Sequence, residues 1–196
     1  ELLRLLEEPA PVGEARGGYE YSRSSNPTRT ALEECMAALE GGKHGLAFAS
    51  GLAAEDTLLR TIASPGSHFV IPDDAYGGTF RIIDKVFTQW GIDYTAVALS
   101  DLDAVRNAIT SKTKLIIVET PTNPLLSIAD ISAIARIAAP SNIKVLVDNT
   151  FASPALQQPL LLGADIVLHS TTKYIGGHSD VVGGALLTSD QQLDEA

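Results

Sequence analysis

The sequence predicts an α/β fold in which a mainly parallel central sheet is covered by helices on both faces. Apolar, strand-like runs alternate along the chain with helical stretches, which is the rhythm of βαβ units. The strand-like runs, such as Leu115-Ile116-Ile117-Val118, are apolar throughout, as expected for strands buried on both faces. With 196 residues, 45% of them hydrophobic, the chain can bury the core that this fold requires.

The first expected element is an amphipathic helix at residues 1–8, where leucines stand among charged residues, and a Pro-rich linker follows it to residue 16. A polar, aromatic-rich loop at residues 17–26 has little capacity to pack into a core. Pro27 then opens a helix that runs to residue 40 with apolar residues at helical spacing, and the glycine pair that begins at Gly41 ends it.

Changes in apolar periodicity set the bounds of the later elements. Strands are expected at residues 45–49, 68–72, 94–98, 114–119, 144–148 and 165–169. Helices are expected at residues 52–63, 77–90, 102–109, 131–138 and 155–162. Residues 181–188 can add one more strand, in an antiparallel orientation, while the other strands are joined by right-handed crossovers.

Composition excludes several classes of function. A formal net charge of -10 disfavours a nucleic-acid or anionic-membrane partner. The single cysteine, Cys35, excludes an intrachain disulfide and a thiolate metal cluster, and we expect no metal site. No apolar run approaches the ~20 residues of a membrane-spanning helix, and the first residues do not resemble a signal peptide. We therefore expect a cytoplasmic protein.

Functional residues are expected just after the strands, because open α/β sheets bind ligands beyond the carboxyl ends of their strands. Hydroxyl, carboxylate, amide and aromatic side chains gather at these positions in four segments, at residues 50–52, 73–79, 119–124 and 148–150. A fifth segment, at residues 170–173, contains Lys173. A lysine on a loop after a strand is by default a surface residue. The alternative is an amine that forms a Schiff base with a carbonyl cofactor.

Two of these segments have both an ordinary and a functional interpretation. Ser50-Gly51 precedes a helix, so its backbone N–H groups can cradle a phosphate, although small and hydroxyl residues are equally expected there as a helix cap. Tyr76 stands beside two glycines and can offer a flat stacking surface, although a lone loop tyrosine more often packs against its own fold.

Two polar residues further along the chain also allow two interpretations. Asp148 follows a buried strand and is either the N-cap of the next helix or the partner of a protonated ring nitrogen. Asn123, in a Pro-Thr-Asn-Pro turn, is either a turn former or a side-chain donor to a cofactor oxygen.

Together these motifs resemble the Cys/Met-metabolism family of pyridoxal-phosphate enzymes, which has the aspartate-aminotransferase-like fold. Six blocks occur in the order and with the spacing of that family, and the resemblance runs from about Gly17 to the end of the chain. The blocks are Tyr21-Ser22-Arg23 with Asn26-Pro27-Thr28, Ser50-Gly51-Leu52, Asp74-Ala75-Tyr76-Gly77-Gly78-Thr79, Glu119-Thr120-Pro121-Thr122-Asn123-Pro124, Val147-Asp148-Asn149-Thr150 and His169-Ser170-Thr171-Thr172-Lys173-Tyr174. The fold implied is the large domain of a fold type I enzyme, at residues 17–196.

The resemblance implies the cofactor pyridoxal 5'-phosphate and a role for each matched residue. Lys173 forms the Schiff base and moves protons between substrate carbons, and Tyr76, counted with it as catalytic, stacks on the cofactor ring. The remaining implied contacts are the phosphate with Ser50, Gly51, Leu52, Ser170 and Thr172, the ring nitrogen with Asp148, the ring 3-oxygen with Asn123, and a further cofactor contact at Thr150.

The resemblance also implies an oligomer. Tyr21 and Arg23 are expected to reach the cofactor phosphate of a neighbouring subunit, since an Arg fork matches phosphate geometry and their loop has no obvious ligand in its own chain. Each active site then requires a homodimer, and two dimers form a homotetramer. Family members are about twice this length. The C-terminal small domain, with the arginine for the substrate carboxylate, is therefore expected to be absent from these residues.

Two activities on small amino-acid substrates, and one function without turnover, are compatible with this resemblance. The leading expectation is γ-replacement, in which an O-acylhomoserine loses its γ-substituent and accepts cysteine sulfur to give cystathionine. The first alternative is γ-elimination, because the matched residues serve cofactor chemistry common to both reactions. The second alternative is a cofactor-binding module without turnover.

Overall fold

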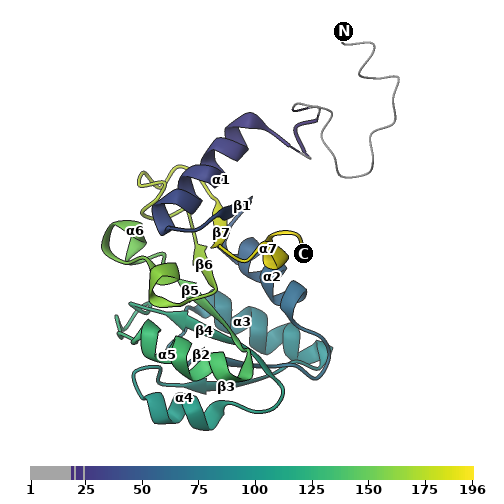
Figure 1. Cartoon of the computed structure of the whole chain (residues 1–196), viewed down its shortest axis with the longest axis vertical. Coiled ribbons are helices and arrows are strands. Elements are labelled where there is room, and N and C mark those ends of the chain that lie inside the picture. The colour runs from purple at the N-terminus through teal and green to yellow at the C-terminus, as the bar shows by residue number, and fades with distance from the viewer. Residues whose placement is uncertain (1–18, 20, 24) are drawn as a thin grey trace.

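The computed structural model describes residue 19, residues 21–23 and residues 25–196. The expected helix and linker at residues 1–16 lie outside the described residues. The described part is one seven-stranded sheet flanked by helices, in the strand order β1-β7-β6-β5-β4-β2-β3 (Figure 1). Of these strands, β7 (Gly184–Thr188) is antiparallel to both neighbours, β1 (His44–Phe48) and β6 (Ile166–His169).

The remaining pairs in the sheet are parallel, which confirms the expected mainly parallel α/β architecture. The strands in these pairs are β2 (His68–Pro72), β3 (Asp93–Val97), β4 (Thr113–Glu119) and β5 (Lys144–Asp148), with β6 beside β5. The bounds of β2 and β5 are those predicted from the sequence. The antiparallel strand expected within residues 181–188 is confirmed as β7.

Helices cover both faces of the sheet, as predicted. Alternate residues of β4 serve the two faces: Leu115 and Ile117 pack with α2 (Gly51–Ile62) and α3 (Gly77–Lys85), whereas Ile116 and Val118 pack with α4 (Leu102–Ala108) and α5 (Ile131–Ala138). A third apolar cluster joins α1 (Pro27–Glu40) to β6 and β7. The short helix α7 (Gln191–Asp194) follows β7.

Local sequence signals account for the ends of α1. The Asn26 side chain accepts hydrogen bonds from the backbone N–H groups of Thr28 and Arg29, at 2.9 and 3.3 Å, and Pro27 occupies the first helical position. Gly41 ends the helix in the left-handed conformation, with φ of 73°. The N-terminal end of α1 points away from the body of the molecule (Figure 1).

Two helix predictions need correction. The expected helix at 155–162 is wrong: the chain forms α6 (Ser153–Leu156) and a separate 3₁₀ turn, η4 (Pro159–Leu162). Pro159 causes the break, because proline disfavours the helical conformation of the residue before it and has no N–H to donate. The helix expected at 77–90 is α3 followed by the 3₁₀ turn η2 (Phe87–Trp90).

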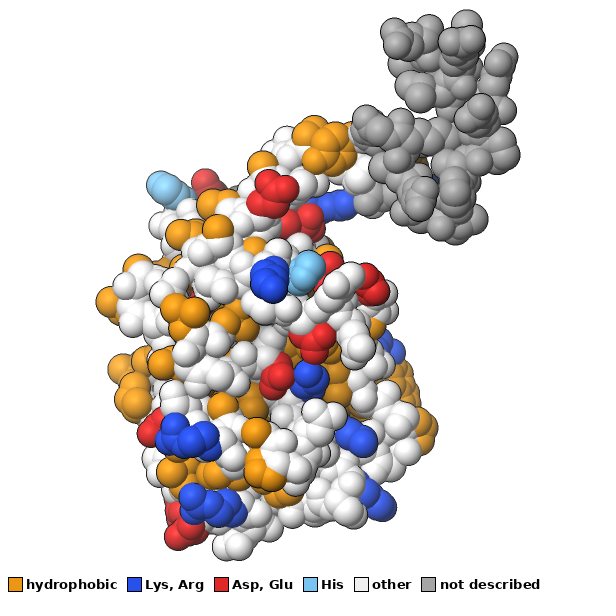
Figure 2. Space-filling model, viewed as in Figure 1, with side chains coloured by type: hydrophobic (Ala, Val, Ile, Leu, Met, Phe, Trp, Pro, Cys, Tyr) orange, Lys and Arg blue, Asp and Glu red, His pale blue; other side chains and the backbone are white. Residues whose placement is uncertain are grey.

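In Figure 2, Lys and Arg side chains are scattered among Asp and Glu over the visible face rather than gathered into one patch. Within the part of the chain that the structure describes, no helix has the length and apolar character of a membrane-spanning segment.

Candidate active site

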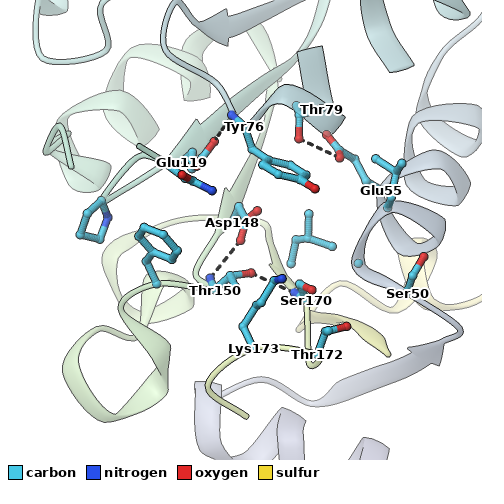
Figure 3. Close-up of a pocket in the computed structure, with 16 residues that line it drawn as sticks. Ser50, Glu55, Tyr76, Thr79, Glu119, Asp148, Thr150, Ser170, Thr172 and Lys173 are labelled. Carbon is cyan, nitrogen blue, oxygen red and sulfur yellow. Dashed lines mark hydrogen bonds between the residues drawn. The ribbon is translucent and has the colours of Figure 1, made fainter. Parts of the chain in front are cut away.

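One cavity of about 230 Å³ lies where strands β4, β5 and β6 end and helices α2 and α3 begin (Figure 3). Ten of the residues expected to bind or act on the cofactor line it: Ser50, Gly51, Leu52, Tyr76, Asn123, Asp148, Thr150, Ser170, Thr172 and Lys173. The fold therefore brings together residues that lie far apart in the sequence.

Tyr21 and Arg23 do not line this cavity. Both are exposed on the segment before α1, and the Arg23 guanidinium lies 4.8 Å from the centre of the Tyr21 ring. Their expected role at a neighbouring subunit stays a prediction, since the structure contains a single chain.

The N-terminus of α2 forms one wall of the cavity. The Ser50 hydroxyl accepts a hydrogen bond from the Ala53 N–H at 3.0 Å, so Ser50 is the cap that the ordinary interpretation expects. A Cβ placed on Gly51 would lie 2.8 Å from the Ser170 Cβ, so only glycine allows α2 to approach the loop after β6 this closely. The first N–H groups of this helix, at a positive helix end, suit an anionic group.

Asp148 contributes a carboxyl group to the lining of the cavity. It stands at the end of β5, and its Oδ1 accepts a hydrogen bond from the Thr150 N–H at 2.9 Å. It is not the N-cap of α6, a position held by Ala152. Desolvation by burial raises the pKa of the Asp148 carboxyl, while its hydrogen bonds to Thr150 oppose that shift. No ion pair joins Asp148 to a cation within the described residues, so a protonated ligand atom can take that place.

The loop after β6 supplies the hydroxyl and amine groups. The Ser170 N–H donates to the Thr150 hydroxyl at 2.9 Å, which fixes this loop against the end of β5. The Thr172 hydroxyl donates to the Gly183 carbonyl at 3.2 Å and accepts from the Gly183 N–H at 3.0 Å. Lys173 is exposed, and its amine points into the cavity (Figure 3).

Glu119 connects the remaining two site residues. Its two carboxylate oxygens accept hydrogen bonds from the backbone N–H groups of Tyr76 and Asn123, both at 2.7 Å. Burial raises the pKa of the Glu119 carboxyl to about 7, and these hydrogen bonds oppose the rise. A Cβ at Gly78 would overlap the Tyr76 ring, so the glycine makes room for the ring at the start of α3.

Sequence reasoning assigned no role to three acidic or hydroxyl residues of the cavity, Glu55, Thr79 and Glu119. A signal for Glu55 existed, because it lies four residues after Gly51 and so on the same face of α2. That face is otherwise apolar, with Leu58 and Leu59 buried. Thr79 donates from α3 to Glu55, a contact that the sequence of either helix alone does not indicate.

The cavity therefore fits a ligand with an anionic group at the α2 N-terminus, a protonated aromatic nitrogen at Asp148 and a carbonyl within reach of the Lys173 amine. Tyr76 offers a ring face beside it. These are the functional groups of pyridoxal 5'-phosphate.

The chain belongs to the Cys/Met metabolism PLP-dependent enzyme family, whose profile matches residues 7–196. The match begins upstream of Gly17, the point from which the motifs are recognisable. The family depends on pyridoxal phosphate, which confirms the predicted cofactor.

Particular relatives are similar over nearly the whole chain. A cystathionine gamma-synthase of Mycobacterium leprae is 69% identical over 94% of this chain and 48% of its own length. The crystal structure of metB from Corynebacterium glutamicum has a TM-score of 0.91 and 61% identity, over 94% of this chain and 48% of that one. A cystathionine gamma-lyase from Lactobacillus plantarum, complexed with L-serine, has a TM-score of 0.90 and 52% identity, over 96% of this chain and 49% of that one. The chain spans about half the length of the relatives it matches.

Proposed function

We propose that this chain forms the cofactor-binding part of an enzyme that joins an O-acylhomoserine to cysteine and releases cystathionine. The observation that carries the proposal is the single cavity that gathers the α2 N-terminus, Tyr76, Asp148 and Lys173. The similarity to a relative named cystathionine gamma-synthase supports the synthase over other members of the family.

In this proposal the cavity residues hold the cofactor by its two ends. The phosphate is bound by the N–H groups of Gly51 and Leu52, with Ser50, Ser170 and Thr172 around it. At the opposite end Asp148 pairs with the ring nitrogen and Asn123 forms a hydrogen bond with the ring 3-oxygen. Tyr76 stacks on the ring, and Thr150 makes a further contact with the cofactor.

When bound, the cofactor supplies an electron sink for negative charge at the substrate carbons. Lys173 holds and moves the protons, because its amine lies in the cavity where those carbons must stand. Asp148 keeps the ring nitrogen protonated, and Glu119 orients Tyr76 and Asn123 through their backbone N–H groups.

We further propose how the protein assembles and where it acts. We place Tyr21 and Arg23 at the phosphate of a neighbouring subunit, so the functional unit is a homodimer that pairs into a homotetramer. The Arg23 guanidinium, exposed beside the Tyr21 ring, is accessible to such a partner. The substrates are small amino acids, and the protein acts in the cytoplasm.

The second candidate is γ-elimination from cystathionine, favoured by the likeness to the gamma-lyase of known structure. The purified protein, incubated with pyridoxal phosphate, distinguishes the two. We expect cystathionine from cysteine with O-acetylhomoserine or O-succinylhomoserine, and slower ketobutyrate release from cystathionine alone. Faster release from cystathionine would overturn the synthase in favour of the lyase. Cofactor binding without any product would leave the third alternative, a cofactor-binding module.

A further inference from the structure

Glu55 is a buried carboxyl in the cavity to which the proposed function assigns no role. It lies one helical turn after Gly51 on α2, is 2% exposed and lines the same cavity. Its Oε2 accepts a hydrogen bond from the Thr79 hydroxyl at 2.9 Å, from α3 (Figure 3). Its Oε1 is buried and has no hydrogen-bond partner within the described residues.

The charged groups that act most on Glu55 are all acidic. Asp148 and Glu119 stand at the ends of neighbouring strands, and Asp56 follows Glu55 directly in α2.

The other described groups around Glu55 carry no charge that neutralises it. Helix α3 contributes the Thr79 hydroxyl, and the Tyr76 phenol stands just before the first turn of that helix. Strand β6 contributes Leu168, and Lys173 is exposed beyond the end of β6. An ionised carboxylate buried without a cation is costly, so the neutral acid is favoured. Burial, followed by the acidic neighbours, raises the pKa of the Glu55 carboxyl to about 8.

Given the function proposed above, on which this step rests, we propose that Glu55 is a positioning residue of the cofactor site that stays protonated. A neutral Glu55 leaves Asp148 as the charged carboxyl that meets the ring nitrogen. A neutral Glu55 also adds no negative charge beside the phosphate, which binds one turn earlier on the same helix.

A proton linkage follows from this placement. The phosphate carries close to two negative charges above about pH 7, so it binds more weakly once Glu55 ionises. Cofactor affinity must then fall as pH rises through the pKa of Glu55, and the loss must disappear when residue 55 cannot ionise.

The test uses pyridoxine 5'-phosphate, which has the cofactor's ring nitrogen and phosphate but an alcohol in place of the aldehyde, so that Lys173 cannot bond to it. Its dissociation constant is measured by calorimetry at about pH 7 and about pH 9 for the cofactor-free protein. The same two measurements are made for Glu55→Gln and for Asp56→Asn, a control that removes a carboxylate from the neighbouring position of α2. We expect the constant to rise up to about tenfold more in the wild type than in Glu55→Gln. Asp56→Asn should keep this rise, because it lowers the pKa of the Glu55 carboxyl by removing one acidic neighbour but leaves Glu55 able to ionise.

A second variant keeps the proposal testable if Glu55→Gln folds poorly. Thr79→Val removes the hydroxyl that favours the ionised carboxylate, so the pH at which affinity falls is expected to move upward.

Two results would overturn the proposal. One is a dissociation constant that changes equally with pH in the wild type and in Glu55→Gln. The other is a loss of affinity in Glu55→Gln that is the same at both pH values. If the wild type bound no probe at any pH, the proposed function itself would fail, and this step with it.

Discussion

At the carboxyl ends of strands β5 and β6, the two faces of the sheet present polar groups of different kinds, although residues of the two faces alternate along the chain. On the front face, Asp148 and Ser170 border the open cavity. On the back face, the next residue after Asp148 and the one before Ser170 are Asn149 and His169, and both are completely buried.

The back-face residues form a network with the end of α1. His169 Nε2 and the Asn149 amide lie 2.5 and 2.7 Å from the same oxygen, Glu40 Oε1. The Gln157 amide donates to Asn149 Oδ1 at 2.9 Å and to the Thr120 carbonyl at 3.1 Å. This network links α1 and the segments after β4, β5 and β6.

The two faces differ in whether their polar groups have partners within the fold. The back face pairs a carboxylate with an imidazole and an amide inside the fold, with Glu40 Oε2 and His169 Nδ1 left without hydrogen-bond partners within the described residues. The front face gathers Glu55, Glu119 and Asp148, and within the described residues only backbone and hydroxyl donors meet them. On the front face Asp148 is therefore available to a protonated ligand atom, at a cost to stability, whereas the back-face groups hold the strands in place.

The comparison predicts the largest effect for Lys173→Ala. Turnover is expected to fall by roughly 10³-fold or more, because the variant loses both the covalent link to the cofactor and the proton carrier. The melting temperature is expected to stay unchanged, since the side chain is exposed. Lys112→Ala, at another exposed lysine, is the control for activity. Unfolding of Lys173→Ala would show that this front-face residue is structural.

The next effect concerns the back face. Glu40→Ala removes the shared acceptor of His169 and Asn149 and leaves buried donors unpaired, so the free energy of unfolding is expected to fall by about 4 kcal/mol. Guanidinium unfolding of the cofactor-free protein measures this change, with Glu34→Ala, an exposed position of the same helix, as the control. Equal stability of the two variants would contradict the structural role of the network.

A smaller effect is expected from Glu119 on the front face, which should make the free energy of unfolding depend on pH. Glu119 has a pKa near 7 in the folded protein, against an ordinary value of 4.5. The folded state therefore binds a proton at Glu119 more tightly than the unfolded state does. The contribution of this proton to the free energy of unfolding is full below pH 4.5 and is lost as pH rises to about 7. The loss amounts to at most about 3 kcal/mol.

Urea unfolding of the cofactor-free protein at several pH values measures this slope, which is expected to be shallower in Glu119→Gln. The exposed-position variant Glu34→Gln should retain the wild-type slope. A slope in Glu119→Gln as steep as that of the wild type would mean that Glu119 ionises normally in the folded state.

The smallest effect is expected at the segment before α1. Arg23→Ala should weaken pyridoxal-phosphate binding about tenfold through the lost contact to a neighbouring subunit, as expected for one charge-assisted hydrogen bond. Fluorescence titration gives the affinity, with Arg106→Ala, at an exposed arginine paired with Asp103, as the control. An unchanged affinity would count against the contact between subunits.

The sequence predicted the fold well where local signals and packing agree. The apolar runs of β2 and β5 and the capping residues of α1 lie as expected. Helix continuity was harder to predict. After α3, the Thr88 and Gln89 side chains donate to the carbonyls of Asp84 and Lys85, and the chain continues as a 3₁₀ turn.

The candidate site was predicted where motifs specify it and missed where only tertiary packing does. Ten motif residues line the cavity. Glu55 lies on the apolar face of α2, but the partner of its carboxyl, Thr79 of α3, is 24 residues away and meets it only in the fold. Glu119 ends strand β4 and its partner Asn123 follows four residues later, but its other backbone partner, Tyr76, lies 43 residues away and meets it only in the fold.

We propose that the front-face cavity holds pyridoxal phosphate on Lys173. The most direct test is the mass of the purified, cofactor-loaded protein with and without borohydride reduction, followed by peptide mapping. We predict that reduction adds the mass of one reduced cofactor to each chain and that the addition maps to Lys173. An addition at another lysine, or no addition, would contradict the role proposed for Lys173.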